Sequence, residues 1–388
     1  MPKTWARIPR EKTTDSITKT MKNSVITQCL TTLAAGVFAF TTIATAEEPS
    51  GAIYTMDNAS GANRVLAWRR AGNGSLAGAG TFATGGAGTG AGLSSQGSVL
   101  LTRDGHWLVV CNTGSDDLSL FAVSDQGLQL VDRVSSQGRS PVSLTLNRNV
   151  LYALNAGGAL GDKDNIAAFL LADGHLAPIP DSRRALSGDN TGPAQVSFTD
   201  DGSTLIVTER TTSVIDTFAL DEGGLAANRK GFQSAGATPF GFAVGRRNRL
   251  FVSEAGASTV SSYAVSGAGN LEIISASVPT DQSAACWLIS SLDQRFLYTA
   301  NAGSGSLSGF AVGSDGSIHA LNPSGRTADT GAGSHPVDMS LSNDGRFLFT
   351  LANGNGTLLG FRTRPDGSLQ PVAGINGLPT STAGLAGR

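Results

Sequence analysis

The stretch LYTANAGSGSLSGFAVGSDGSIHAL, Leu297–Leu321, contains two apolar runs, a turn signal and the beginning of a third run. In SLSGFAV, from Ser306, apolar residues alternate around an aromatic side chain, a pattern typical of a β-strand. Asp315-Gly316 is a dipeptide that favours a tight hairpin turn. The stretch therefore predicts consecutive antiparallel strands joined by short turns.

Similar stretches recur at intervals of roughly 45–55 residues, and self-similarity at a fixed period indicates a repeat architecture. Seven copies of the first run are present: IYTMDN from Ile53, LVVCNTG from Leu108, LYALNAGG from Leu151, LIVTERT from Leu205, LFVSEAG from Leu250, LYTANAG from Leu297 and LFTLANG from Leu348. A further run precedes the next copy, as in PVSLTL from Pro141 and PVDMSL from Pro336. Four strands in each of seven units predict an all-β fold, a seven-bladed β-propeller with four-stranded antiparallel blades.

The two ends of the repeat region predict how the ring closes. The chain enters at the second strand of a unit, at Ile53, and ends on STAGLAG, Ser381–Gly387. STAGLAG resembles GAGLSSQG, Gly90–Gly97, which we interpret as a first-strand segment. We therefore expect the C-terminal strand to complete the blade that the N-terminal strand begins.

The first residues have the composition of a targeting segment. Met21-Lys22 is a basic start, Leu30–Phe40 is an apolar core, and Ala44-Thr45-Ala46 is a small-residue end. We interpret residues 1–20 as an upstream extension, 21–46 as a signal peptide and 47–388 as a single propeller domain. A short N-terminal anchor is the alternative. The prediction is a periplasmic or secreted bacterial protein without stable membrane insertion after signal cleavage.

Charge and cysteine content narrow the possible partners. The chain has 28 Lys and Arg against 30 Asp and Glu, and removal of residues 1–46 leaves a net charge of −6. Basic patches suited to nucleic acid are missing from this pattern.

Cys111 and Cys286 remain after cleavage, and we interpret both as small buried apolar residues, although two cysteines would also allow one disulfide. No paired Cys or His has zinc spacing, so we expect no metal and no cofactor, with a divalent cation on carboxylates as the alternative.

Seven short strings in this chain resemble a known family. They are GLSSQGS, GPAQVSF, TERTT, ATPFGFAV, VSEAG, AACW and TGAGSHPVD. These strings are similar to those of the seven-bladed propeller lactonases, which include propeller-type 6-phosphogluconolactonases and fungal carboxymuconate-lactonising enzymes. The resemblance spans about residues 51–388 and is strongest to a secreted bacterial branch. It implies the propeller fold and chemistry on a lactone.

One position of the repeat, at the end of the second strand, is occupied by glutamate in two of the seven copies. At the end of the second strand the copies carry Asp57, Asn112, Asn155, Glu209, Glu254, Asn301 and Ala352 or Asn353. Asn is the expected residue there, since its side chain caps turns. If this column faces the channel mouth, Glu209 and Glu254 stand on neighbouring blades above one cleft, with Arg210 beside them. The alternative for Glu209 and Arg210 is a surface pair of little energetic weight.

The innermost strand has a second mixed column. Its members are Ser98, Ser143, Gln195, Gly241, Trp287 and Asp338, with Gln96 and His335 near the start of the same strands. Polar residues in this column favour a wet channel over a packed apolar axis. A lactone hydrolase needs a base, a group that stabilises the oxyanion and an anchor for an anionic group of the substrate. We assign these roles to Glu209 or Glu254, to His335 and to Arg210, with Gln195, Gln96, Asp338 and Trp287 as substrate-binding residues.

These observations lead to three alternative functions. The first is an exported monomeric lactone hydrolase that acts on a small sugar or aromatic-acid lactone. The second is a non-catalytic propeller that binds a small ligand or a protein, and the third is a lactonising cyclase. His335 has a structural alternative as well, because the family's commoner string places His after the proline and here His335 precedes Pro336.

Overall fold

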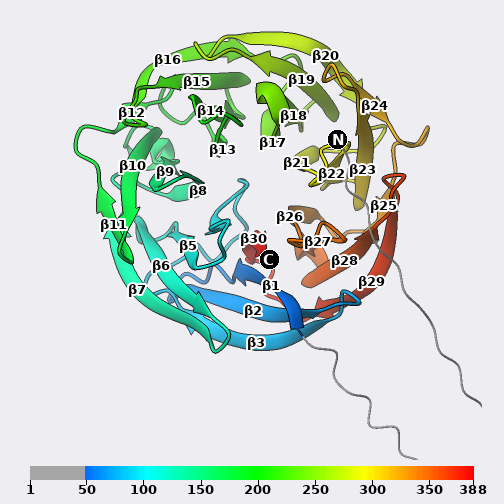
Figure 1. Ribbon diagram of the computed structural model, residues 1–388, viewed down its shortest axis with the longest axis horizontal. Coiled ribbons are helices and arrows are strands. Elements are labelled where there is room, and N and C mark those ends of the chain that lie inside the picture. The colour runs from blue at the N-terminus through cyan, green and yellow to red at the C-terminus, as the bar shows by residue number, and fades with distance from the viewer. Residues whose placement is uncertain (1–48) are drawn as a thin grey trace, which may run out of the picture. The chain divides into compact units, whose positions relative to one another are not determined.

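The computed structural model describes residues 49–388, which form seven antiparallel sheets arranged as the blades of a ring (Figure 1). The predictions of an upstream extension over 1–20 and of a signal peptide over 21–46 lie outside the described residues. Among the described helices, none is long and apolar enough to cross a membrane. The predicted seven-bladed, all-β propeller is confirmed.

The blades are numbered in ring order, and their strands run from the axis outwards. Blade 1 contains β30 (Ala383–Gly387), β1 (Pro49–Met56), β2 (Arg64–Ala71) and β3 (Leu76–Ala83). Blade 2 contains β4 (Val99–Leu101), β5 (Trp107–Asn112), β6 (Asp117–Ser124) and β7 (Gly127–Ser135). Blade 3 contains β8 (Pro141–Asn147), β9 (Val150–Asn155), β10 (Asn165–Ala172) and β11 (His175–Pro178), and β12 (Arg184–Ala185) also pairs with β10.

The remaining four blades follow the same order. Blade 4 contains β13 (Pro193–Phe198), β14 (Thr204–Glu209), β15 (Val214–Leu220) and β16 (Ala226–Gln233). Blade 5 contains β17 (Pro239–Gly245), β18 (Arg249–Glu254), β19 (Thr259–Val265) and β20 (Leu271–Pro279). Blade 6 contains β21 (Ala285–Ser290), β22 (Phe296–Asn301), β23 (Ser306–Val312) and β24 (Ile318–Ala320), with β25 (Ala328–Asp329) also on β23. Blade 7 contains β26 (Pro336–Leu341), β27 (Phe347–Ala352), β28 (Thr357–Thr363) and β29 (Leu369–Asn376). Three connections between strands contain short 3₁₀ turns: η1 (Gly158–Leu160) in blade 3, η2 (Arg246–Asn248) in blade 5 and η3 (Asn353–Asn355) in blade 7.

The C-terminal strand closes the ring, as predicted. β30 pairs antiparallel with β1, with Tyr54 opposite Ala386, and it packs between the inner strands β26 and β4 of the neighbouring blades. The comparison segment chosen from the sequence was wrong, because Gly90–Gly97 forms no strand and β4 begins only at Val99. The prediction of closure therefore succeeded although the proposed internal copy did not.

Apolar side chains on both faces of the second strands form the core between blades. In blade 3 the strand VLYALN, β9, is buried along nearly its whole length. Each blade is covered on both faces by its neighbours, so a second strand carries a continuous apolar run, and each large apolar side chain buried there contributes about 1.5–3 kcal/mol. Cys111 and Cys286 are buried and unpaired, as expected of small apolar residues.

The antiparallel strands divide the loops between two ends of the ring. Turns after the second strands, such as Arg210–Ser213, share one end with the loops that lead into the inner strands. Turns between first and second strands and between third and fourth strands lie at the other end. We call these the Arg210 end and the hairpin end.

Candidate functional site

The polar column of the inner strands is buried at the axis. Gln96, Ser98, Ser143, Gln195, Trp287 and Asp338 all have exposed fractions of 9% or less. Their polar atoms mostly bond to the backbone of other blades, as described next. The predicted wet channel is therefore wrong for this column, since the polar residues join the blades together and do not line an open passage.

Two glutamine side chains link one blade to another by hydrogen bonds to the backbone. Gln96 donates from Nε2 to the Leu288 carbonyl oxygen over 2.8 Å and accepts the Leu288 N–H at Oε1 over 2.9 Å. Gln195 pairs in the same two-way manner with the backbone of Phe242, at 3.0 and 2.6 Å. Each side-chain amide thus donates one hydrogen bond to the backbone and accepts one from it, so their function in this structure is to hold inner strands in place.

A short segment of the β3–β4 connection, Ser95–Gly97, fills the axis itself. The Gln96 N–H donates to the Ala194 carbonyl of blade 4 over 2.9 Å, and the Trp287 indole N–H of blade 6 donates to the Ser95 carbonyl over 2.8 Å. In Figure 1 this light-blue loop enters the middle of the ring between the inner strands. Backbone from blade 2 therefore occupies the centre.

Asp338 belongs to the same axial network. Its Oδ2 accepts the Gly384 N–H over 2.9 Å, and the N–H of Gly97 also lies within hydrogen-bonding reach of the carboxyl group. Burial raises the pKa of Asp338 to about 7, although these backbone donors oppose the rise. Asp338 joins the closing strand to the axial segment and is not exposed to a substrate in this structure.

Glu254, at the end of β18, is fully buried in a set of donors. It accepts hydrogen bonds from the Gly236 N–H over 2.7 Å and from the Ser261 hydroxyl over 2.8 Å, and the Thr259 hydroxyl donates to it as well. Asn112 occupies the corresponding position of blade 2 and bonds at the same spacings, to Asp117 and Ser119. The column therefore ties the second strand to the third, and the expectation that Glu254 faces an open cleft is wrong.

Glu209 is likewise fully buried, at the end of β14. Its carboxylate accepts the Ser187 N–H over 2.8 Å and the hydroxyls of Ser187 and Thr212. Asp216, on the neighbouring strand β15, lies beside it and forms a 2.6 Å ion pair with Arg229. Burial and the adjacent Glu209 carboxylate raise the pKa of Asp216 to about 8, against the opposing effect of Arg229. Glu209 thus forms a buried carboxyl pair and does not face a cleft.

Arg210, directly after Glu209, has different surroundings. Its side chain is half-buried at the Arg210 end, where the guanidinium carbon lies 5.5 Å from the centre of the Phe240 ring and Nε donates to the Gly192 carbonyl over 3.0 Å. Burial lowers the pKa of Arg210. Within residues 49–388, no carboxylate forms an ion pair with it, so the charge is available to an anionic ligand.

Beneath Arg210 lies a buried apolar cluster with side chains from three blades. The rings of Phe240 and Trp287 lie 4.7 Å apart, and Cys286 and the partly buried Val337 pack into the same cluster. Burial raises the pKa of the Cys286 thiol to about 12, so the thiol stays protonated near neutral pH and is a poor nucleophile. Phe240 was not among the site residues expected from the sequence, although the string ATPFGFAV contains it.

His335 is exposed at the start of blade 7, at the same end as Arg210. Its backbone has a φ of 45°, and its carbonyl accepts the Asn353 N–H over 3.3 Å. Val337, two residues further on, packs against the cluster that contains Phe240 and Trp287. Arg210 and His335 therefore lie on blades at either side of one buried apolar cluster, and His335, predicted to stabilise the oxyanion, is the one exposed residue among the three predicted catalytic residues.

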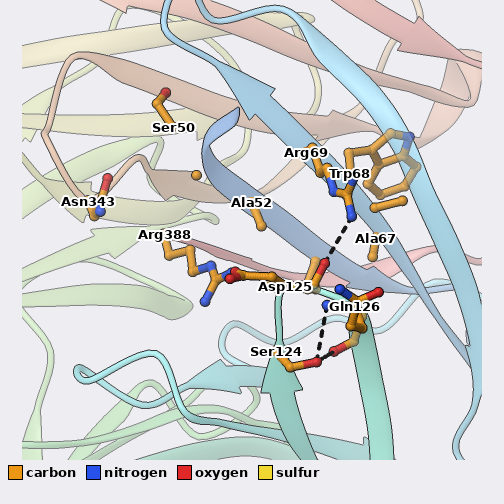
Figure 2. A pocket seen from close by; sticks show the side chains of 14 residues that line it. Ser50, Ala52, Ala67, Trp68, Arg69, Ser124, Asp125, Gln126, Asn343 and Arg388 are labelled. Carbon is orange, nitrogen blue, oxygen red and sulfur yellow. Dashed lines mark hydrogen bonds and ion pairs between the residues drawn. The ribbon is translucent and has the colours of Figure 1, made fainter. Parts of the chain in front are cut away.

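The hairpin end carries a separate cleft of about 740 Å³, between blades 1 and 2 (Figure 2). Tyr54, Trp68 and Arg69 line it from blade 1, with Asp125 opposite and Arg388 at the edge. Both arginines contact Asp125: Arg69 donates to its carbonyl over 2.9 Å, and Arg388 lies 3.7 Å from its carboxylate. The cleft contains no buried base, and none of the site residues expected from the sequence lies in it. Across residues 49–388, no three His, Cys, Asp or Glu side chains are arranged to hold a metal ion.

Comparison with known families gives one match. The profile of the family "Lactonase, 7-bladed beta-propeller" covers residues 50–169 and 269–377, which is more than half of the chain.

Solved structures of similar fold come from several bacteria. A candidate 6-phosphogluconolactonase of Bacteroides fragilis is 19% identical, with a TM-score of 0.66 over 87% of this chain and 98% of that one. The periplasmic gluconolactonase of Pseudomonas aeruginosa is 17% identical, with a TM-score of 0.69 over 86% of this chain and 99% of that one. Virginiamycin B lyase from Staphylococcus aureus is 11% identical, with a TM-score of 0.51 over 72% of this chain and 84% of that one. At these identities the structures support the fold alone, and one fold can carry different chemistry.

Proposed function

The chain belongs to the family of seven-bladed β-propeller lactonases, and from this premise we propose that it is an exported lactone hydrolase acting at the Arg210 end of the ring. The observation that carries the proposal is the half-buried guanidinium of Arg210, which no carboxylate within residues 49–388 neutralises. Keeping an uncompensated cation partly out of water is costly unless an anionic group joins it. Arg210 is therefore suited to bind a substrate carboxylate or the oxyanion that forms during ester hydrolysis.

The buried apolar cluster beneath Arg210 holds the guanidinium in place for a small lactone. Phe240 and Trp287 are only 4% and 5% exposed, so their rings support the guanidinium from below, and a bound lactone would meet the accessible side of Arg210. Ring opening requires water to add to the ester carbonyl and a proton to be removed from that water. The bond between the carbonyl carbon and the ring oxygen then breaks, and the ring oxygen takes up the proton that the base removed, which releases a hydroxy acid.

His335 is the residue we propose as the base for this water. An imidazole accepts protons readily near neutral pH, and His335 is exposed on the same end as Arg210. Glu209 and Glu254, assigned as bases from the sequence, are enclosed by donors and would need a local opening to reach a substrate. No cofactor enters this scheme, because water, a base and an anion-binding group are sufficient for ester hydrolysis.

Export favours a non-phosphorylated sugar lactone or an aromatic-acid lactone as substrate, because phosphorylated sugars are ordinarily intracellular. A non-catalytic ligand-binding propeller is the second candidate, and the burial of Glu209 and Glu254 favours it. A lactonising cyclase would use the same groups in the reverse direction.

The test is hydrolysis by residues 47–388 of a panel of sugar and aromatic-acid lactones, followed by proton release above the uncatalysed rate. We expect Arg210→Gln to lower kcat/KM by about 10²-fold, the scale seen when one oxyanion donor is removed, and Arg210→Lys to recover part of it.

His335→Asn keeps a residue that tolerates positive φ, and we expect it to lower kcat. The exposed His319 on β24 provides the control, since His319→Asn should leave turnover unchanged. Full activity in both the Arg210→Gln and His335→Asn variants would contradict the proposed site, and a flat panel would favour the non-catalytic binder.

A further inference from the structure

A second cleft at the hairpin end, between blades 5 and 6, has four arginines in its lining. Its volume is about 400 Å³, within the range of small-ligand pockets. The lining contains four guanidinium groups, from Arg246, Arg247, Arg249 and Arg295, and a single carboxylate, from Asp293. The chain as a whole carries a net charge of −2, so this cleft has the opposite sign to the rest of the molecule.

Two of these four charges have no acidic partner in the described part of the protein. Arg249 contributes, after the Ser317 hydrogen bonds, to the lowered pKa of the nearby Asp315 carboxyl, and Arg295 also donates to the Pro365 carbonyl. Asp293 lies 3.4 Å from Arg295, the one ion pair found for the four arginines within residues 49–388. Arg246 and Arg247 are exposed, and neither guanidinium has an acceptor within the described residues. Like charges held together at one cleft repel each other, and an anion that enters between them relieves that repulsion.

The backbone fixes these side chains at the edge of the cleft. The Arg246 N–H donates to the Gln294 side-chain oxygen over 2.6 Å, which joins the η2 turn to blade 6. Arg247 has a left-handed backbone with φ of 57°. Such a conformation costs about 1 kcal/mol for a residue with a side chain of this kind. Arg295 is held over the Phe296 ring at 4.9 Å, so the cationic groups are presented from two blades.

We propose that this cleft binds a compact polyanion, a small molecule with two or more phosphate or carboxylate groups. Guanidinium groups match such groups by paired hydrogen bonds as well as by charge. A compact ligand fits better than an extended polymer, because the basic groups are confined to one cleft of limited volume. The cleft lies at the end of the ring opposite Arg210, so the proposal does not depend on the lactone chemistry.

The test is calorimetric titration of residues 47–388 with pyrophosphate and with citrate at low and at physiological ionic strength. The test variant is Arg246→Gln combined with Arg247→Asn, since Asn accepts the left-handed backbone while it removes the charge. The matched control is Arg103→Gln combined with Arg148→Asn, which removes two exposed charges from turns at the same end and includes a second left-handed arginine, with φ of 55°.

We expect saturable binding of one anion per chain that weakens as ionic strength rises. The test variant should lose about tenfold or more in affinity, whereas the control should stay within about twofold, and both should keep any turnover at the Arg210 end. Absence of saturable binding for both probes would overturn the proposal. An equal loss in the control variant would also overturn it, because it would indicate general electrostatic attraction and no specific site.

Discussion

The side-chain amide of Gln96, from blade 2, pairs in both directions with the backbone of Leu288 in blade 6, at 2.8 and 2.9 Å. Three blade steps separate the two residues around the ring, so the contact spans the axis. Blades of a propeller otherwise contact only their neighbours, and stability then accumulates locally. Gln96 adds a connection between blades that are not adjacent. The residues at the centre of the ring therefore contribute to the stability of the whole domain.

Gln96→Ala should therefore destabilise the whole domain. The substitution leaves a buried N–H and a buried carbonyl of Leu288 without partners, and each such loss costs about 1–3 kcal/mol. Chemical denaturation of residues 47–388 measures the effect. Gln126→Ala is the control, since Gln126 is exposed and its side chain has no hydrogen bond within the described part of the chain. A change in the free energy of unfolding equal to that of the control would mean that the Gln96 hydrogen bonds do not contribute to stability.

Glu254→Gln should lower stability and leave any turnover of the folded protein unchanged. An amide in place of the carboxylate cannot accept all the donors that surround Glu254, and we expect a loss of about 1–3 kcal/mol. The exposed Glu272 provides the control through Glu272→Gln. Unfolding curves and turnover measured on the same samples separate the two roles. Lost turnover with unchanged stability would restore the catalytic interpretation of Glu254.

Stability should fall as the pH rises from about 4 to about 7. Burial raises the pKa of Asp338 from 3.8 to about 7, so in this range the native state holds a proton that the unfolded state has released. The stabilisation is complete below the unfolded pKa and is lost as the pH rises through the folded pKa. Asp216, whose pKa rises to about 8, adds a change of the same sign.

Melting temperatures of wild type and Asp338→Asn across this pH range measure the contribution of Asp338. We expect a shallower decline in the variant, whatever its absolute stability, because one of the two raised groups has been removed. Asp315→Asn is the control, since the Ser317 hydrogen bonds lower the pKa of that exposed carboxyl and place its titration below this range. An unchanged slope in Asp338→Asn would contradict the assigned shift.

Removal of residues 380–388 should abolish the cooperative unfolding of the wild type. The deletion takes away β30, its pairing with β1 and the Gly384 N–H that bonds to Asp338. Blade 1 then lacks its inner strand, and the ring is open between β26 and β4. A synthetic peptide of residues 380–388 should restore part of the melting temperature, and a scrambled peptide should not. Unchanged melting of the truncated chain would rule out closure by this strand.

Much of the fold was predictable from the chain alone, because the repeat is local. Alternating apolar residues and Asp-Gly turns specify strands and hairpins within about 50 residues, and seven copies leave a propeller as the natural arrangement. The site was harder to predict. Glu209 and Glu254 break the repeat in sequence, but the pattern of one strand does not indicate whether a long polar side chain points to solvent or toward the next strand.

The sequence by itself determined the blade count, the strand order within each blade and the closure by Ser381–Gly387, since all three follow from periodic burial and turn chemistry. Only the tertiary structure decided which polar residues are accessible. Gln96, Gln195 and Asp338 meet backbone groups from other blades, and those contacts depend on how seven separate units converge on one axis. The same convergence leaves Arg210 without a carboxylate partner among residues 49–388, beside Phe240, a property of the assembled ring that no single repeat encodes.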